Sequence, residues 1–493
     1  MIQRSSGLLL HPTSLANQFA IGDLGSCAYE FADFLSQSGQ SWWQMLPINP
    51  VGRSYSPYQT ISTFAGNPLL LSPEKLMEEG FLNKSELICL SSANPKKINF
   101  SLAIRQKQFW LKLAFERFQA SAFAKMQTDF NDFIEKEASW LIDFSLFMAI
   151  WKKERIADWT RWRRDLRLRQ PHALALARKN LDDDIRYQQF VQYLFARQWR
   201  SLQNYCAQKD IKLIGDVPLF VAHHSSDVWS HPEIFKLNDD GRASVVAGVP
   251  PDDFSSTGQC WNMPVYRWDV LEKQGYTWWI QRLRMTLSRF DMVRLDHFIG
   301  FVRTYEIPMP ALTALNGQYQ PGGGINFFSA IREALGVCPF IAEDLGNKTP
   351  EVDALREELH IPGLNVMQYA FYEDELPAWY HEKNTVVYTG THDNDTIMGW
   401  FEQLSPEKRN HVKKQLKNIE QPINWELINL AWQSQADITL APMQDVLGLG
   451  SDARMNVPGK KIGNWHWRLS QGELSSTLAE KLLYSTNRSF RDL

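Results

Sequence analysis

Phe290-Asp-Met-Val-Arg-Leu-Asp296-His297 is an apolar run that ends in a carboxylate, and two later stretches repeat this pattern. They are Phe340-Ile-Ala-Glu343-Asp344 and Val386-Val-Tyr-Thr-Gly-Thr-His392-Asp393-Asn394. Apolar runs bounded by Gly, Asn or Asp are typical of buried parallel strands. Each stretch therefore predicts a strand that carries an acid to its carboxyl end.

Acids at the ends of parallel strands meet at one edge of the sheet, where barrel enzymes hold their catalytic groups. We therefore expect Asp296, Glu343 and Asp393 to converge, as paired-carboxylate catalysis requires. A helix N-cap or a surface turn would explain any one of these acids alone. Their occurrence in three matching contexts favours the catalytic interpretation.

Segments with strand character recur along the chain, and their number, eight, is the number of strands in a (β/α)8 barrel. The eight candidate segments are 7–10, 42–48, 213–222, 291–297, 340–344, 364–371, 385–391 and 437–447. Segments with helical pattern separate the later ones, at 326–335, 350–359 and 405–417. This alternation is typical of a parallel sheet. The sequence thus predicts an α/β fold, a (β/α)8 TIM barrel forming one decorated domain over 1–493.

Two long interruptions break the alternation. Between the second and third strands, helical spacing begins at Leu111, Ala114, Phe115 and Phe118 and predicts a mostly helical inserted subdomain over 70–205. Between the third and fourth, 223–265 is irregular and rich in Pro, Gly, Ser and Asp. Long ordered loops at this rim tend to be functional, so we expect an active-site lid there.

Several aromatic and basic residues allow two interpretations. Tyr55, Tyr58, Trp261 and Tyr266 lie in turn-like segments and are expected to line an open groove, although core packing is the alternative. The basic segment 161–169 carries apolar residues at helical spacing. It is therefore expected to be the solvated face of an amphipathic helix rather than a site for polyanions.

Composition narrows the class of protein. The 493 residues carry a net charge of −3, which argues against nucleic acid as the main ligand. The five cysteines are scattered without a Cys-x-x-Cys pair, as in reduced intracellular proteins. The only early apolar run is shorter than a signal-peptide core, and no segment approaches a membrane span. We expect a cytoplasmic location without membrane attachment.

No cofactor or metal is expected. Gly448-Leu-Gly450-Ser-Asp-Ala453 imitates a dinucleotide fingerprint but lacks the following βαβ unit, so a turn is expected. Gly322-Gly-Gly324 lacks the Lys-Ser/Thr of a phosphate loop and is interpreted as a rim loop. The pair His223-His224 and His297 have no accompanying zinc-site spacing.

A series of specific motifs runs nearly from end to end and gives the chain a close resemblance to amylomaltases, the 4-α-glucanotransferases or disproportionating enzymes of the α-amylase clan. The motifs are Ser6-Gly-Leu-Leu-Leu-His-Pro-Thr-Ser14, Gly22-Asp-Leu-Gly25, Trp43-Gln-Met-Leu-Pro47, Ser56-Pro-Tyr-Gln59, Phe64-Ala-Gly-Asn-Pro68, Gly215-Asp-Val-Pro218, Val246-Ala-Gly-Val-Pro-Pro-Asp252, Arg294-Leu-Asp-His297, Ala342-Glu-Asp-Leu-Gly346, Thr389-Gly-Thr-His-Asp-Asn394 and Ala453-Arg-Met-Asn456.

The resemblance implies a role for each acid. Asp296 would be the nucleophile, Glu343 the general acid/base and Asp393 the carboxylate that stabilises an oxocarbenium-like transition state. Arg294 would hold Asp296 in its charged form, while Glu343 keeps its proton near neutral pH. The implied sugar-binding residues are Tyr58, Asp216, Gln259, Trp261, Arg294, His392 and Asn456.

The resemblance also implies the substrates, which are α-1,4-glucans such as maltose, maltotriose, maltodextrin and fragments of starch or glycogen. The chain departs from the family pattern at Asp253 and at Asn262-Met263, both within the expected lid. These departures leave open donor and acceptor length, the formation of cyclic glucans and the ratio of transfer to hydrolysis. An α-glucan hydrolase and a catalytically silent glucan-binding protein are the alternatives, and the oligomeric state stays open.

Overall fold

The computed structural model describes residues 4–87, 94–120, 123–251, 255–372, 375–416 and 420–491. Asp253 and Cys89 therefore lie outside the described residues, and the other four cysteines are free thiols. Within the described ranges, no helix combines the length and the apolar character needed to cross a membrane.

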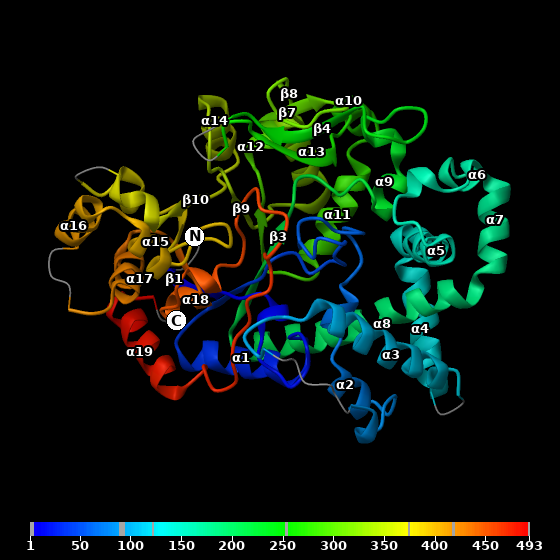
Figure 1. The fold of residues 1–493 in the computed structure, drawn as a ribbon, viewed down its shortest axis with the longest axis horizontal. Coiled ribbons are helices and arrows are strands. Elements are labelled where there is room, and N and C mark those ends of the chain that lie inside the picture. The colour runs from blue at the N-terminus through cyan, green and yellow to red at the C-terminus, as the bar shows by residue number, and fades with distance from the viewer. Residues whose placement is uncertain are drawn as a thin grey trace.

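A closed barrel of eight parallel strands forms the centre of the molecule (Figure 1). Neighbouring strands follow the order β1-β12-β11-β10-β9-β6-β3-β2. Each of the eight predicted segments overlaps one of these strands, which confirms the (β/α)8 prediction. The bounds are β1 (Ser5–Leu9), β2 (Trp42–Gln44), β3 (Lys212–Val217), β6 (Met292–Leu295), β9 (Phe340–Ala342), β10 (Gly363–Val366), β11 (Thr385–Tyr388) and β12 (Ile438–Pro442).

Both faces of the barrel sheet are buried, as the apolar runs predict. Alternate side chains fill the interior, where Ile214, Met292, Val386 and Leu440 belong to one cluster. The intervening residues, such as Val293, pack in the larger core outside the barrel wall. The helices that follow the strands cover this outer face: α1 (Ser26–Gln37), α11 (Thr277–Leu287), α13 (Gly324–Leu335), α14 (Pro350–Glu358), α15 (Ile397–Gln403), α16 (Pro406–Gln415), α17 (Ile423–Gln433) and α19 (Ser476–Arg488).

The chain between β2 and β3 is helical. It holds α2 (Pro73–Glu78), α3 (Phe100–Phe118), α4 (Ala124–Lys136), α5 (Ala138–Glu154), α6 (Arg164–Arg167), α7 (Pro171–Asn180) and α8 (Asp182–Gln208). Figure 1 shows α3 to α7 standing to the right of the barrel. Stacking of Phe118 on Phe190, with ring centroids 4.6 Å apart, packs α3 against α8. That 70–205 forms a subdomain of its own stays a prediction.

A second sheet at the rim was not predicted. Its antiparallel strands run in the order β5-β4-β7-β8, and they are β4 (Val245–Val249), β5 (Gln259–Pro264), β7 (Arg303–Pro308) and β8 (Gln318–Pro321). The irregular stretch expected over 223–265 therefore contains two strands. Short helices flank this part of the rim and the last strand, at α9 (Ser226–Ser230), α10 (Trp268–Lys273), α12 (Ile299–Val302) and α18 (Met443–Val446).

Two further interpretations were wrong. Tyr266 does not line a groove, because it is fully buried and packs at tilted angles against Phe235, Trp278 and Trp279. The basic segment 161–169 is not one amphipathic helix, since a short 3-10 turn precedes α6 and Arg169 adopts a positive φ of 51°. Burial of Trp162 and Leu166 explains its apolar residues, whereas Leu168 is exposed.

Candidate active site

Acidic side chains lie at the carboxyl ends of three neighbouring barrel strands, β3, β6 and β9, and after β11, which β10 separates from β9. Asp216 is the penultimate residue of β3, Asp296 follows β6, and Glu343 follows β9. Asp393 lies in the loop after β11. Because all eight strands are parallel, these acids share one rim, as expected from the three strand-end motifs.

The Arg294 guanidinium joins three of these acids. Its Nη1 lies 2.9 Å from both carboxylate oxygens of Asp216 and 2.8 Å from Oδ1 of Asp296. Its Nη2 lies 3.8 Å from Oε2 of Glu343. Burial alone would lower the pKa of Arg294, but Asp216 and Asp296 raise it well above its usual value. The site therefore holds a fixed positive charge at its centre.

Glu343 is the acid best placed to retain a proton. Its side chain is 13% exposed, against 25% for Asp296. Burial, reinforced by the charge of Asp296, raises the pKa of Glu343 to about 7, although Arg294 and two backbone bonds oppose the shift. Those bonds come from the N–H groups of His297 and Leu345, at 2.8 Å and 3.1 Å. Glu343 is thus oriented by the main chain and half protonated near neutral pH.

Tyr58 and His392 lie beside Asp216 at the same rim. The Tyr58 hydroxyl donates to Oδ2 of Asp216 at 2.7 Å, and its oxygen lies 3.3 Å from Nδ1 of His392. The two rings stack with centroids 4.8 Å apart. Burial, together with the charge of Asp216, raises the pKa of Tyr58 well above its usual value, so the hydroxyl stays a donor. Asp216, predicted as a sugar ligand, is thus held by both Tyr58 and Arg294.

Asp393 is the most open of the three predicted catalytic acids, with 47% of its side chain exposed. Its Oδ2 lies 3.4 Å from Nε2 of His392. The Asn456 amide donates to its Oδ1 at 2.5 Å, so this predicted sugar-binding residue also orients an acid. The structure therefore brings Asp393 to the same rim as Arg294 through the chain of contacts Asp393, His392, Tyr58 and Asp216.

Gln259 and Trp261 reach the site from β5, the edge strand of the rim sheet. The Trp261 ring meets the ring of His297 edge to face, with centroids 4.9 Å apart. Its Nε1–H donates to Oε1 of Gln259 at 3.2 Å. Asn262 adopts a φ of 57°, a left-handed conformation that Gly and Asn tolerate better than other residues. This explains how Asn can stand where the family pattern has Gly.

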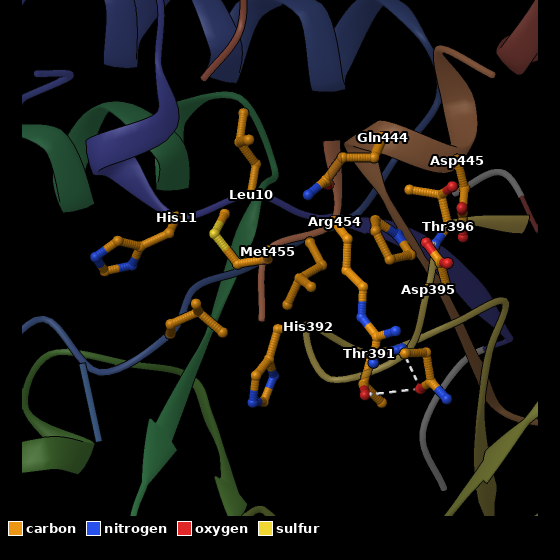
Figure 2. Close-up of a pocket in the computed structure, with 14 residues that line it drawn as sticks. Leu10, His11, Thr391, His392, Asp395, Thr396, Gln444, Asp445, Arg454 and Met455 are labelled. Atoms are coloured by element: carbon orange, nitrogen blue, oxygen red, sulfur yellow. Dashed lines mark hydrogen bonds between the residues drawn. The ribbon is translucent and has the colours of Figure 1, made fainter. Parts of the chain in front are cut away.

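A small hollow lies beside the loop that carries His392 (Figure 2). Its lining includes His392, His11, Gln444, Arg454 and Met455, but none of the three predicted catalytic acids. Figure 2 shows the Arg454 side chain extending towards Thr391, on the loop that carries His392. The three predicted catalytic acids therefore do not line this hollow.

Sequence reasoning missed three residues that shape the site. His297 donates its main-chain N–H to Glu343 from a positive φ of 54°. Asp445 accepts from Thr389 Oγ1 at 2.6 Å and from the N–H of Ile397 at 2.8 Å, and burial raises its pKa to about 6. Arg454 donates to the main-chain carbonyl of Asp393. His297 and Arg454 stand within the quoted motifs, which offered a signal, whereas Asp445 stands outside them.

The described ranges contain no set of side chains arranged to bind a metal ion. There, no group of three or more His, Cys, Asp or Glu side chains is arranged to hold an ion. The acids at the rim are instead joined by Arg294, which occupies the position that a cation would take between Asp216 and Asp296.

Known proteins match this chain over nearly its whole length. A family model described as 4-alpha-glucanotransferase matches residues 10–475. A 4-alpha-glucanotransferase from Synechocystis sp. is 44% identical over 491 residues, covering 98% of this chain and 97% of that protein, and one from Thermus thermophilus is 43% identical over 485 residues, covering 96% of each. The structure of an amylomaltase from Streptococcus agalactiae in complex with acarbose covers 100% of both chains with a TM-score of 0.96 at 34% identity. The chain therefore belongs to the 4-alpha-glucanotransferase family.

Proposed function

We propose that this 4-alpha-glucanotransferase moves α-1,4-glucan segments by a retaining double displacement, with Asp296 as nucleophile, Glu343 as general acid/base and Asp393 as transition-state stabiliser. The observation that carries the proposal is that two neighbouring acids have different surroundings. Arg294 pairs with Asp296 at 2.8 Å, whereas burial raises the pKa of Glu343 to about 7. A nucleophile requires a carboxylate held by a positive charge, and a general acid requires a carboxyl group that keeps its proton.

In the first step, a carboxylate oxygen of Asp296 forms a bond to the anomeric carbon of the donor. The bond from that carbon to the glycosidic oxygen breaks, and Glu343 delivers its proton to the departing O4. The product is a covalent glycosyl-enzyme with inverted configuration. Asp393 faces the positive charge that develops on the sugar ring during this step.

In the second step, the 4-hydroxyl of an acceptor attacks the same carbon. Glu343 takes the hydroxyl proton, and Asp296 leaves as a carboxylate, so the second inversion restores the original configuration. A sugar acceptor gives transfer, and water gives hydrolysis. The substrates that we propose are maltose, maltotriose, maltodextrin and fragments of starch or glycogen.

The sugar in the reacting subsite would be held by groups that are already oriented. Asp216 and His392 would bind its hydroxyls, and Tyr58 would stack on the ring. Asn456 stands beside Asp393 on one side, and Trp261 with Gln259 approaches from β5 on the other. Since Tyr58, Asp216 and Arg294 already bond to one another, little ordering is needed on binding.

Incubation of the purified protein with maltotriose tests the activity. Free glucose, total reducing ends and the oligosaccharide ladder are followed together. Glucose plus longer maltodextrins at constant reducing ends is expected. Rising reducing ends without longer products would instead establish a hydrolase, and no reaction with any maltodextrin would leave only a binding role.

The roles of the acids are tested by Asp296→Asn and Glu343→Gln. Each is expected to lower kcat by at least about 10³-fold. Asp296→Asn removes the group that bonds to the anomeric carbon, and Glu343→Gln removes the group that transfers the proton. Glu358→Gln is the matched control, since this exposed acid ends α14, outside the rim. A Glu343→Gln enzyme with full activity towards maltotriose would contradict the assignment of the acid.

A further inference from the structure

The loop that carries Asp393 is held from outside by one arginine. Arg454 donates from Nη2 to the carbonyl oxygen of Asp393 at 2.5 Å. It also donates from Nε to the carbonyl oxygen of Asn456 at 2.7 Å. Both acceptors are main-chain carbonyls, so the guanidinium fixes the course of the backbone rather than neutralising a carboxylate.

Asn456 closes this arrangement. Its side chain donates to Oδ1 of Asp393, and its main-chain N–H donates to the carbonyl oxygen of His392 at 3.1 Å. Arg454 therefore fixes both ends of one contact: the backbone from which Asp393 projects, and the backbone of the residue that orients the Asp393 carboxylate. Bonds within the loop join Thr391 to Asn394, and the Asn394 amide also donates to the Tyr369 hydroxyl at 2.9 Å.

We infer that Arg454 is a positioning residue that acts through Asp393, and this inference rests on the transition-state role proposed above for that acid. Arginine suits the task because its planar fork can serve two carbonyls in fixed directions. An ammonium group on a flexible stem cannot hold both in the same geometry. The carboxylate of Asp393 is half exposed, so packing alone does not fix its place.

The first test is Arg454→Ala, assayed with α-maltosyl fluoride as donor and glucose as acceptor. A misplacement of about 1 Å can cost on the order of 10²-fold, so kcat is expected to fall about 30-fold or more with KM within about 3-fold. Arg454→Lys is expected to lie between the wild type and Arg454→Ala. Guanidinium ion at millimolar concentration is expected to restore part of the lost rate to Arg454→Ala.

Arg491→Ala is the matched control. Arg491 is a fully buried arginine that also donates to main-chain carbonyls, of Ser5, Trp432 and Ser434, at the opposite end of the barrel strands. Its loss is expected to lower the melting temperature while kcat per folded enzyme stays unchanged. If Arg454→Ala behaves in this same way, Arg454 has only a structural role and the inference is overturned.

The deciding test is the double variant Arg454→Ala/Asp393→Asn. If Arg454 acts through the Asp393 carboxylate, its removal in the Asp393→Asn background should cost less than about 3-fold, because the group that it positions is already gone. An equal cost in both backgrounds would overturn the inference alone. An unchanged rate in Asp393→Asn by itself would overturn the role proposed for Asp393, and the positioning inference with it.

Discussion

Asp296 and Glu343 lie at one rim but have different hydrogen-bond partners and different burial. Asp296 receives a charged hydrogen bond from Arg294, whereas Glu343 is more buried and receives two main-chain N–H groups. The three acids and Arg294 could be predicted, because strand-end position and motif agree on them. Arg454 and His297 could not be assigned roles, since both act through contacts that depend on how distant loops meet.

We expect kcat/KM for maltotriose to fall above pH 7, tenfold per pH unit at the limit. Glu343 must be protonated to donate to the leaving oxygen, and burial raises its pKa to about 7. The measurement is kcat/KM from pH 5 to 9. α-Maltosyl fluoride is the control donor, because fluoride leaves without a proton, so its alkaline limb should be weaker. Identical limbs for both donors would contradict the acid role of Glu343.

The same group should make stability depend on pH. The pKa of Glu343 is about 7 in the folded state and near 4.5 when unfolded, so the native state binds its proton more tightly. Proton binding by Glu343 therefore stabilises the native state at low pH, and this part of the free energy of unfolding is lost as pH rises from about 4.5 through 7. We expect the melting temperature of Glu343→Gln, relative to wild type, to increase from pH 5 to pH 8. Parallel curves for the two proteins would show that Glu343 titrates normally.

At the scale of elements, the barrel strands could be predicted and the rim sheet could not. Barrel strands such as β11 are continuous apolar runs with both faces buried, which is a strong local signal. The rim strands are short, and β8 is polar and largely exposed. β4 has an apolar run, Val245-Val-Ala-Gly-Val249, but the Pro and Gly around it favoured a loop. Its partner β7, and β8 beyond it, come from a distant part of the chain.

Gly248 on β4 provides a test of how the rim sheet positions β5. A Cβ built there would lie 2.1 Å from the carbonyl oxygen of Gln259 and 2.5 Å from Cδ1 of Ile307. Gly248→Ala must therefore push β5 away, together with Gln259 and Trp261. We expect the ratio of transfer to hydrolysis, measured with maltotriose, to fall by about tenfold, since small displacements of positioning groups are costly.

Gln318→Ala is the control for this variant, because Gln318 is exposed on β8 at the opposite edge of the same sheet. It should leave the ratio of transfer to hydrolysis unchanged. An unchanged ratio in Gly248→Ala as well, with the protein folded, would show that β5 does not control acceptor use.

At the scale of the whole molecule, the closure of the barrel joins its first and last strands along the chain. β1 pairs with β12 along its whole length, from Ser5 opposite Ile438 to Leu9 opposite Pro442. The number of strands predicted this closure. The packing of the 70–205 helices against one another could not be predicted, because aromatic contacts such as Phe118 with Phe190 depend on tertiary placement.

Arg491 secures this closure from the N-terminal end of the strands. It donates to the carbonyls of Trp432, Ser5 and Ser434, at 2.6 Å, 3.0 Å and 2.9 Å. Arg491→Ala removes three bonds from a buried charged donor and should cost about 3 kcal/mol of the free energy of unfolding. We expect a lower melting temperature by circular dichroism. Arg488→Ala, at the exposed end of α19, should leave it unchanged.

Activity should separate from stability in the same variant. The acids occupy the carboxyl ends of the strands, whereas Arg491 binds Ser5, the first residue of β1. In barrel enzymes the face at the amino ends of the strands serves stability. The kcat of Arg491→Ala for maltotriose, measured well below its melting temperature, should therefore equal that of wild type. A kcat reduced tenfold in fully folded protein would mean that strain at one end of the barrel reaches Asp296 and Glu343 at the other.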